Sequence, residues 1–541
     1  MLKRYLIFTY ITLSLSSLLF AQNKGEKLFD NSYVHEIRIT FYEPNFWDSL
    51  ESHYEKIWES GEKNYLRAQI KIDGQEIDTV GVREKGFNSN QGGDSRNPDY
   101  AKYAKKPFKI DVNEFIENQT FDGLKKFNLN NCIHDRSYMR DLLAYDILRK
   151  AGVKAPRTSY AKLYLNDIPW GLYLIVEQVD KTFLKSRLGN KNGNLYKANW
   201  TDLDWKGNDY KEYKDDMVKK TNKSKNDWSD FIRFVGIVNN IPDDQIKDSL
   251  NAVLNVENYL NTLAVDVAIN NWDSYFDHGR NFYIYFDENI NKFQWIPWDY
   301  DLSFESSFNT EIFPKGFGGG NSDSNDNNEA YFKILIKRIK ETEVFRNSYL
   351  DKFNTMLSDN FTVERINELI DQTSNLIRES AKADTNWSFT FKDFEKSISD
   401  QGPEPDNSSP EFGGSAGLKY FIKNRVDSLK QKLSALLITS VAANNNITPS
   451  NVELMQNYPN PFNPTTKIKF TIPASGISSQ SKTTLIVYGI LGNEIKTLVN
   501  EYKPAGEYEI KFNAEDLSSG MYIYKLTTGD HTSVKRMILL K

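Results

Sequence analysis

The sequence predicts an α+β domain whose C-terminal part is helical, followed by a small all-β sandwich domain. Three observations lead to this fold class. Strand-like runs and two hairpin patterns dominate the chain before Asp180, whereas amphipathic helical patterns dominate from Glu329 to Leu437. From residue 451 onward, short alternating strands separated by Gly and Pro turns continue to the last residue.

The composition indicates a folded, multidomain protein. A chain of 541 residues is too long for one ordinary core, and 39% hydrophobic with 13% aromatic residues is ample for packed interiors. A formal charge of -5 gives no basic field, so nucleic acid is not expected as a partner. The single cysteine, Cys132, excludes an intrachain disulfide.

The first 21 residues have the order of a secretory signal peptide. Lys3 and Arg4 precede an apolar run from Tyr5 to Phe20, and Ala21 follows as the small residue. A membrane anchor is the alternative, but the run is short and is broken by Thr12, Ser14, Ser16 and Ser17. We expect residues 1–21 to be removed and the mature chain to have no transmembrane span.

The first half of the large domain combines strands with helices. The turn pairs Asp73-Gly74 and Asn166-Asp167 each separate two alternating runs, which is typical of β-hairpins. Ser137 is a plausible N-cap for a helix that ends before Gly152. The expected elements are strands at 35–41, 65–72, 75–83, 106–110, 160–165 and 170–178 and helices at 46–60 and 137–151.

The second half becomes mostly helical after one more pair of strands. Composition predicts loops at 318–328 and 401–417 and a linker at 438–450. The expected elements are strands at 281–286 and 292–297 and helices at 329–342, 363–381 and 418–437.

Acidic and amide residues gather around that late pair of strands. Asp273 ends a helical run, Asn281 opens a strand and Asp299 follows the returning strand, so a hairpin would bring these residues to one side. Carboxylate and amide oxygens suit a hard cation such as Mg²⁺ that is shared with substrate phosphate. Such residues at strand ends also cap helices and stabilise turns, and the spacing leaves both interpretations open.

The C-terminal segment, 451–541, opens on the run from Asn457 to Thr466, which reads Asn-Tyr-Pro-Asn-Pro-Phe-Asn-Pro-Thr-Thr. Its turn pattern alone indicates a small β domain, equally suited to a carbohydrate-binding or spacer module. The segment resembles the type A sorting domain of the type IX secretion system. This resemblance implies export through the periplasm and outer membrane, the type IX machinery as a partner, and a secreted or cell-surface location.

The large domain, residues 34–437, resembles the CotH kinase family. The matching blocks, in chain order, are Gly81-Val82-Arg83 to Gly86, Lys106 to Ile110, Asn128 to Asn130, Met139-Arg140, Gly152 to Pro156, Leu163-Tyr164, Gly171 to Leu174, Val176 to Asp180, Leu195 to Lys197, and Asp273 to Asp301.

The resemblance implies an atypical protein-kinase-like fold that transfers the γ-phosphoryl group of ATP to Ser or Thr of an exported or surface protein. Asp273 is similar to the catalytic Asp, and Asn281 and Asp299 are similar to the ligands of Mg²⁺ (or Ca²⁺). Asp301 is a further candidate metal residue.

The same resemblance implies a set of ATP-binding residues. Lys106 is similar to the strand lysine that holds the phosphates, and Glu177 is its candidate partner. Arg140 is a third candidate for cofactor binding, although a structural ion pair explains it equally well. The chain departs from the family at Lys85, where an arginine is common, and it contains no glycine-rich phosphate loop in the required context.

Three function classes therefore compete. The leading one is a secreted protein kinase. The second is a non-catalytic surface scaffold or adhesin with a structural divalent cation, which the scarcity of ATP outside the cytoplasm favours. The third is a metal-assisted hydrolase of surface polysaccharide, which the aromatic-rich composition permits without supporting.

Overall fold

The computed structural model describes residues 24–86, 105–305, 311–314, 332–403, 416–444, 452–472, 481–504, 506–529 and 531–541. The chain forms two compact units that divide after Leu433, and each is described by itself. The predicted signal peptide and the predicted loop at 318–328 lie outside the described residues. Among the described residues, none of the helices combines the length and the apolar character needed to cross a membrane.

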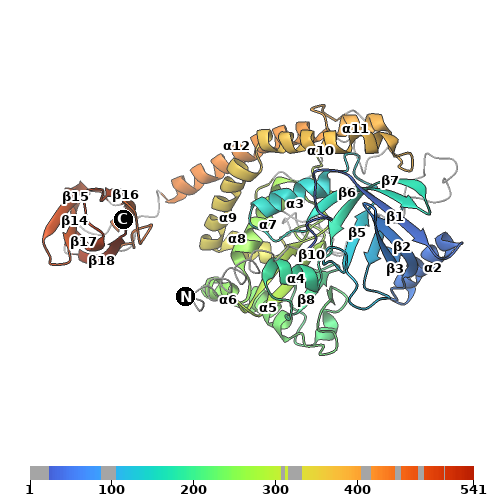
Figure 1. The fold of residues 1–541 in the computed structure, drawn as a ribbon. Coiled ribbons are helices and arrows are strands. Elements are labelled where there is room, and N and C mark those ends of the chain that lie inside the picture. The colour runs from blue at the N-terminus through green and yellow to red at the C-terminus, as the bar shows by residue number, and fades with distance from the viewer. Residues whose placement is uncertain are drawn as a thin grey trace, which may run out of the picture. The chain divides into compact units, whose positions relative to one another are not determined.

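Seven strands of the first unit close into a barrel, seen in blue and cyan in Figure 1. Strands β1 and β6 close it in parallel, with Ile37 beside Leu163, and apolar side chains fill its interior. In barrel order the strands are β1 (His35–Phe41), β2 (Leu66–Ile72), β3 (Gln75–Glu84), β4 (Phe108–Asp111), β5 (Lys126–Asn130), β7 (Ile168–Glu177) and β6 (Thr158–Leu165).

The two predicted hairpins are confirmed as β2–β3 and β6–β7. The φ angles of Asp73 and Gly74 are +48° and +84°, and those of Asn166 and Asp167 are +47° and +64°. Positive φ at both central residues is the requirement of a tight hairpin turn whose twist matches the strands. The predicted helix after β1 is also present, as α2 (Phe46–Glu59).

Strand alternation gives β3 and β4 two different faces. Val82, Phe108 and Ile110 point into the barrel and are fully buried there. Arg83 and Lys109 point to the outer face, where they lie directly opposite each other in the antiparallel register. This outer face carries the cationic half of the candidate site.

The rest of the first unit is a mainly helical layer around a four-stranded sheet in the order β11, β10, β8, β9. Helix α7 packs on β11, and α10 packs on α3 and β7 (Figure 1). The strands are β8 (Leu195–Ala198), β9 (Met217–Lys219), β10 (Phe282–Asp287) and β11 (Lys292–Pro297). The helices are α3 (Arg140–Lys150), α4 (Lys181–Leu188), α5 (Ser229–Asn240), α6 (Ile246–Val253), α7 (Val256–Ala268), α8 (Ile334–Glu341), α9 (Glu343–Thr355), α10 (Val363–Ala383), α11 (Phe391–Ser397) and α12 (Leu418–Asn444).

Two sequence predictions in this unit need correction. Helix α3 begins at Arg140 with Met139, rather than Ser137, as its N-cap residue, and the Asp135 carboxylate accepts a hydrogen bond from the Arg140 amide at 2.8 Å. Helix α12 continues to Asn444, into the segment 438–450 that composition predicted as a linker.

The second unit is a small all-β domain, as predicted. Its two sheets have the strand orders β12, β13, β16 and β15, β14, β17, β18, and they share one apolar core. The strands are β12 (Glu453–Leu454), β13 (Thr465–Ile472), β14 (Ser481–Gly489), β15 (Glu494–Lys503), β16 (Gly506–Asn513), β17 (Gly520–Thr528) and β18 (His531–Leu539).

Candidate active site

The β10–β11 hairpin brings Asn281 and Asp299 to the same end of the sheet, as the sequence predicted. Phe282 pairs with Pro297, and the Trp298 amide donates to the Asn281 carbonyl at 3.1 Å. Asn281 and Asp299 both adopt left-handed backbone conformations, with φ of +61° and +62°. Such conformations are uncommon outside glycine and cluster at functional sites.

Asp273 lies against this hairpin end and is held by two neighbours. The Asn281 Nδ2 donates to the carbonyl oxygen of Asp273 at 2.9 Å and to its Oδ2 at 2.8 Å. The Arg280 guanidinium donates to the Asp273 Oδ1 at 2.5 Å. Burial raises the pKa of Asp273 above its usual value, and Arg280 opposes this effect.

Asp141, in the first turn of α3, joins these residues, although the sequence did not single it out. It accepts hydrogen bonds from the Tyr300 amide at 2.7 Å and from the Asn130 Nδ2 at 3.0 Å. Burial, followed by the charge of Asp299, raises the pKa of Asp141 to about 7. The same two causes raise the pKa of Asp301 well above its usual value. We call Asp141, Asp273, Asn281, Asp299 and Asp301 the acidic cluster.

The acidic cluster offers oxygen donors of the type that a hard cation prefers. Within the described ranges, no three His, Cys, Asp or Glu side chains are already arranged as ligands of one metal ion. Mg²⁺ commonly takes only one or two carboxylates and completes its shell with phosphate and water oxygens. The Asn130 Oδ1 beside Asp141 is buried without a hydrogen-bond partner. These donors therefore fit a cation that is shared with substrate phosphate.

Arg140 lies beside the acidic cluster, and its guanidinium contacts acidic residues. Its Nη1 donates to the Glu305 Oε1 at 2.7 Å and to the Asp301 carbonyl at 3.2 Å, and its Nε lies 3.7 Å from the Asp135 Oδ1. The structural ion pair that the sequence left open is thus present. We assign Arg140 to positioning the backbone that carries Asp301, in place of contacting phosphate.

Two lysines lie near the acidic cluster and over the ring of Trp298. The Lys85 Nζ lies 5.9 Å and the Lys197 Nζ 6.0 Å from the ring centroid. Burial lowers the pKa of Lys85, while the nearby Asp299 acts in the opposite direction. Burial likewise lowers the pKa of Lys197, to about 8.

Lys109 is a third cation on this side, and it projects from the outer face of β4. Its Nζ donates to the Gln178 Oε1, while burial and then the charge of Arg83 hold its pKa well below the usual value. In the part of the chain that the structure describes, Lys85, Lys109 and Lys197 form no ion pair with a carboxylate. We call Lys85, Lys109 and Lys197 the inner cations.

The predicted pairing of Glu177 with Lys106 is wrong. Glu177 instead makes ion pairs with Arg157 at 2.6 Å and with Arg187 at 3.2 Å. Successive strand residues face opposite sides, and the next residue, Gln178, is the one that accepts from Lys109.

Lys106 precedes β4, and its carbonyl accepts a hydrogen bond from the Tyr173 hydroxyl at 2.8 Å. Its assignment to the phosphates stays a prediction. The signal for Lys109 was present in the sequence, because it alternates with the buried Phe108 and Ile110.

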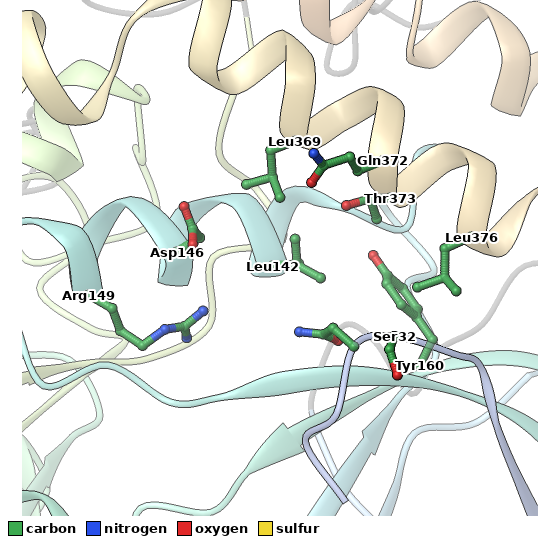
Figure 2. A pocket seen from close by; sticks show the side chains of 10 residues that line it. Ser32, Leu142, Asp146, Arg149, Tyr160, Leu369, Gln372, Thr373 and Leu376 are labelled. Atoms are coloured by element: carbon green, nitrogen blue, oxygen red, sulfur yellow. The ribbon is translucent and has the colours of Figure 1, made fainter. Parts of the chain in front are cut away.

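A hollow of about 340 Å³ lies away from this chemistry, between α3 and α10. Figure 2 shows Asp146 and Arg149 of α3 on one side and Gln372 of α10 on the other. Arg149 donates to the Pro156 carbonyl, and Asp146 pairs with Arg365. Neither the acidic cluster nor the inner cations line this hollow, so we do not assign it to the site.

Comparison with known proteins places both parts of the chain. Residues 83–429, which include the acidic cluster and the inner cations, match the family described as CotH kinase protein. The inner spore coat protein H of Bacillus subtilis (strain 168) is 26% identical over 346 residues, which cover 62% of this chain and 84% of that protein. Residues 456–540 match a secretion system C-terminal sorting domain.

The sorting domain indicates export and a cell-surface or secreted location, with the type IX secretion machinery as a partner. The match to the CotH kinase model covers more than half of the sequence. The chain therefore belongs to the CotH kinase protein family.

Proposed function

We propose that the chain is an exported protein kinase that transfers the γ-phosphoryl group of ATP to Ser or Thr of an exported or surface protein, with Mg²⁺ or Ca²⁺ as cofactor. The observation that carries this proposal is the arrangement around Trp298. Lys85 and Lys197, which have no ion-pair partner among the described residues, lie over the Trp298 ring, and the Asp299 carboxylate is close enough to both for its charge to act on them. Phosphoryl transfer depends mainly on positioning and on neutralising phosphate charge, and this arrangement supports both.

Each part of the acidic cluster has a role in this proposal. Asn281 and Asp299, with Asp301 beside them, would hold the divalent cation, which when bound draws negative charge from the phosphoryl oxygens. The acceptor hydroxyl oxygen forms a bond to the γ-phosphorus while the bond to the β-phosphate oxygen breaks and ADP leaves. Asp273 takes the hydroxyl proton, and its raised pKa suits it to that task.

The inner cations would bind the phosphates of ATP. Lys85 and Lys197 are next to both Trp298 and the charge of Asp299, so they lie where the β- and γ-phosphates must meet the cation. Lys109, fixed by Gln178, extends the positive charge along the outer face of β4. Lys109 lies directly opposite Arg83 in the β3–β4 register, so two cationic side chains meet on this face. Lys109 is therefore a stronger candidate than Lys106 for the strand lysine that binds phosphate.

The test is transfer of radiolabel from γ-labelled ATP, with Mg²⁺, to α-casein as a generic Ser-rich acceptor. Asp273→Asn should lower the initial rate by about 100-fold or more, because the general base is removed. Asp248→Asn, at an exposed position of α6, is the matched control and should retain the wild-type rate. Equal labelling by the wild type and the Asp273 variant would contradict the assignment of Asp273.

The scaffold alternative has one observation in its favour. The Asp273 carboxylate already accepts from Arg280 and Asn281, as a purely structural residue would. If the cation serves stability alone, Mg²⁺ or Ca²⁺ will raise the melting temperature of the wild type but no label will be transferred. Both results together would favour the scaffold over the kinase.

A further inference from the structure

Arg280 holds one oxygen of the Asp273 carboxylate with two nitrogen atoms, and the proposed transfer reaction gives this contact no role. The Arg280 Nε donates to the Asp273 Oδ1 at 2.5 Å, and the Nη2 lies 2.5 Å from the same oxygen. The Asn281 Nδ2 donates to the other oxygen, Oδ2, at 2.8 Å. A carboxylate has about four acceptor sites, two on each oxygen. Both sites of Oδ1 are therefore occupied, whereas Oδ2 keeps one site for a further donor.

The ring of Trp200 lies on the Arg280 guanidinium. The guanidinium carbon is 4.3 Å from the ring centroid, which is a cation–π contact. Trp200 is 51% exposed, so core packing does not explain its place, whereas the side chains of Arg280 and Asp273 are mostly buried. The Arg280 guanidinium is thus bound by a carboxylate and by an aromatic ring at the same time.

Strand register brings Trp200 to Arg280. Strand β8 pairs antiparallel with β10, and beyond both strands the Thr201 amide still donates to the Gly279 carbonyl at 2.8 Å. Trp200 therefore lies across from Arg280. The φ angle of Gly279 is +65°, and a Cβ atom there would lie 2.2 Å from the Thr201 carbonyl oxygen. Only glycine lets the two segments approach this closely.

We propose that Arg280 and Trp200 are positioning residues for the transfer reaction. Arg280 fills Oδ1 of Asp273 and so reserves Oδ2 for the proton of the acceptor hydroxyl, and Trp200 keeps the guanidinium in place. This inference rests on the proposed kinase function, because it concerns the general base of that kinase.

The reserved oxygen is the one beside the candidate metal ligand Asn281. Asn281 binds Asp273 through its Nδ2, so its amide oxygen can serve the cation. A hydroxyl that donates to Oδ2 is thereby held toward the γ-phosphate. Its proton passes to Oδ2 and leaves the bonding electrons on the acceptor oxygen. That oxygen forms the bond to the γ-phosphorus, while the β-phosphate oxygen leaves with the electron pair of the broken bond.

A phosphate-binding role for Arg280 is the alternative. An arginine that binds phosphate commonly offers two parallel N–H groups to the phosphate oxygens. In Arg280 the edge with Nε and Nη2 already binds Asp273, and the ring of Trp200 lies against the guanidinium. We therefore assign Arg280 to Asp273, and the Michaelis constant for ATP distinguishes the two roles.

The experiment measures kcat and KM for ATP separately on the full mature chain, with γ-labelled ATP, Mg²⁺ and α-casein. Trp200→Ala removes the ring, and Trp200→Phe restores an aromatic face. Arg280→Lys keeps the charge but replaces the two-nitrogen edge by a single nitrogen. Trp58→Ala is the matched control, because Trp58 is 55% exposed and lies on α2. The melting temperature of each variant shows that the assayed protein is folded.

We expect kcat to fall by about 100-fold in Arg280→Lys and by about fivefold in Trp200→Ala, with KM for ATP within about twofold of the wild type. Trp200→Phe should recover most of the lost kcat, and Trp58→Ala should keep the wild-type value. A KM for ATP raised at least about tenfold in Arg280→Lys, with kcat unchanged, would overturn the proposal, because Arg280 would then bind phosphate.

A second measurement needs no transfer of label. Carbodiimide with glycine ethyl ester modifies accessible carboxylates, and mass spectrometry of the peptides gives the extent at Asp273. We expect Trp200→Ala to raise the modification of Asp273 at least about threefold, because the guanidinium is no longer held on Oδ1. The exposed Asp248 of α6 is the internal standard, and Trp58→Ala should match the wild type.

The positioning role and the kinase function fail in different ways. If the wild type labels no acceptor but Trp200→Ala opens Asp273 to carbodiimide, the positioning of the carboxylate is supported and only the transfer reaction is overturned. If the wild type labels casein but Trp200→Ala keeps both the wild-type kcat and the wild-type modification of Asp273, the kinase stands and the positioning role is overturned.

Discussion

Two lysines on either side of Pro107 show how differently one fold treats buried charge. The Lys105 Nζ lies 2.6 Å from the Asp384 Oδ2, and both side chains are almost completely inaccessible. The same ammonium group also donates to the Leu172 carbonyl at 2.6 Å. Lys109, four residues later by sequence number, donates to the neutral Gln178 and faces Arg83 across the strands.

The difference separates a structural charge from one that awaits a ligand. Asp384 is further held by the Tyr138 hydroxyl at 2.8 Å and the Leu172 amide at 2.9 Å, so the Lys105 pair is neutralised and hydrogen-bonded. Lys109 keeps its attraction for an anion because no carboxylate neutralises it among the described residues. Buried charges that lack compensation are costly, and proteins keep them mainly at functional sites.

The largest expected effect comes from breaking the neutralised pair. Asp384→Asn leaves the Lys105 ammonium buried without its counter-charge, and we expect a loss of about 3–5 kcal/mol in the free energy of unfolding. Urea denaturation followed by tryptophan fluorescence measures it. The double variant Lys105→Met, Asp384→Leu removes both charges and should recover part of the lost stability. No recovery would show that the Lys105–Asp384 pair stabilises the fold through packing and not through charge.

The second prediction concerns the lysine that is not neutralised. Lys109→Met removes a buried charge, so the free energy of unfolding should stay constant or rise, whereas Asp384→Asn in the Lys105–Asp384 pair should lower it. Phosphate transfer should fall by about 100-fold, since a cation on the phosphates is lost. Denaturation and label transfer are measured on the same preparation. A large loss of stability with normal transfer would reverse the roles of the two lysines.

A pH titration of anion affinity extends this comparison, and its expected effect is smaller than the two above. The pKa of Lys197 is lowered to about 8, so this lysine loses positive charge as the pH rises from 7 to 9. Bound anion favours the charged lysine, so metal-free pyrophosphate should bind about tenfold more weakly at pH 9 than at pH 7. Calorimetric titration of the wild type and Lys197→Met checks this, and a flat profile in the wild type would contradict it.

The smallest effect is expected from removing residues 452–541. Among the described residues, first-unit side chains build the apolar cores of the first unit, and the sorting domain has its own core. The truncated chain should therefore keep the wild-type rate of label transfer and the same melting transition for the first unit. Loss of either would show that the sorting domain takes part in the site.

Local patterns predicted much of this structure. Turn chemistry predicted both hairpins of the barrel, and the spacing from Asp273 to Asp299 predicted which residues meet at the β10–β11 end. Local patterns could not predict the closure of the barrel, because β1 pairs in parallel with β6, which lies more than a hundred residues later in the sequence.

The parts of the site that the sequence missed depend on such distant pairings. Asp141 meets the Asp299 loop only because α3 packs beside it, and Asn130 joins through β5. The error at Glu177 is one of strand parity, in which a shift of a single residue exchanges the two faces.

Calorimetric titration of ATP with and without Mg²⁺ tests the central claim most directly, namely that the acidic cluster and the inner cations bind phosphate and a divalent cation as one site. We predict that Mg²⁺ strengthens ATP binding to the wild type by at least about tenfold and that Asp299→Asn abolishes this gain while Asp248→Asn retains it. ATP affinity that is the same with and without Mg²⁺ in the wild type would contradict the account.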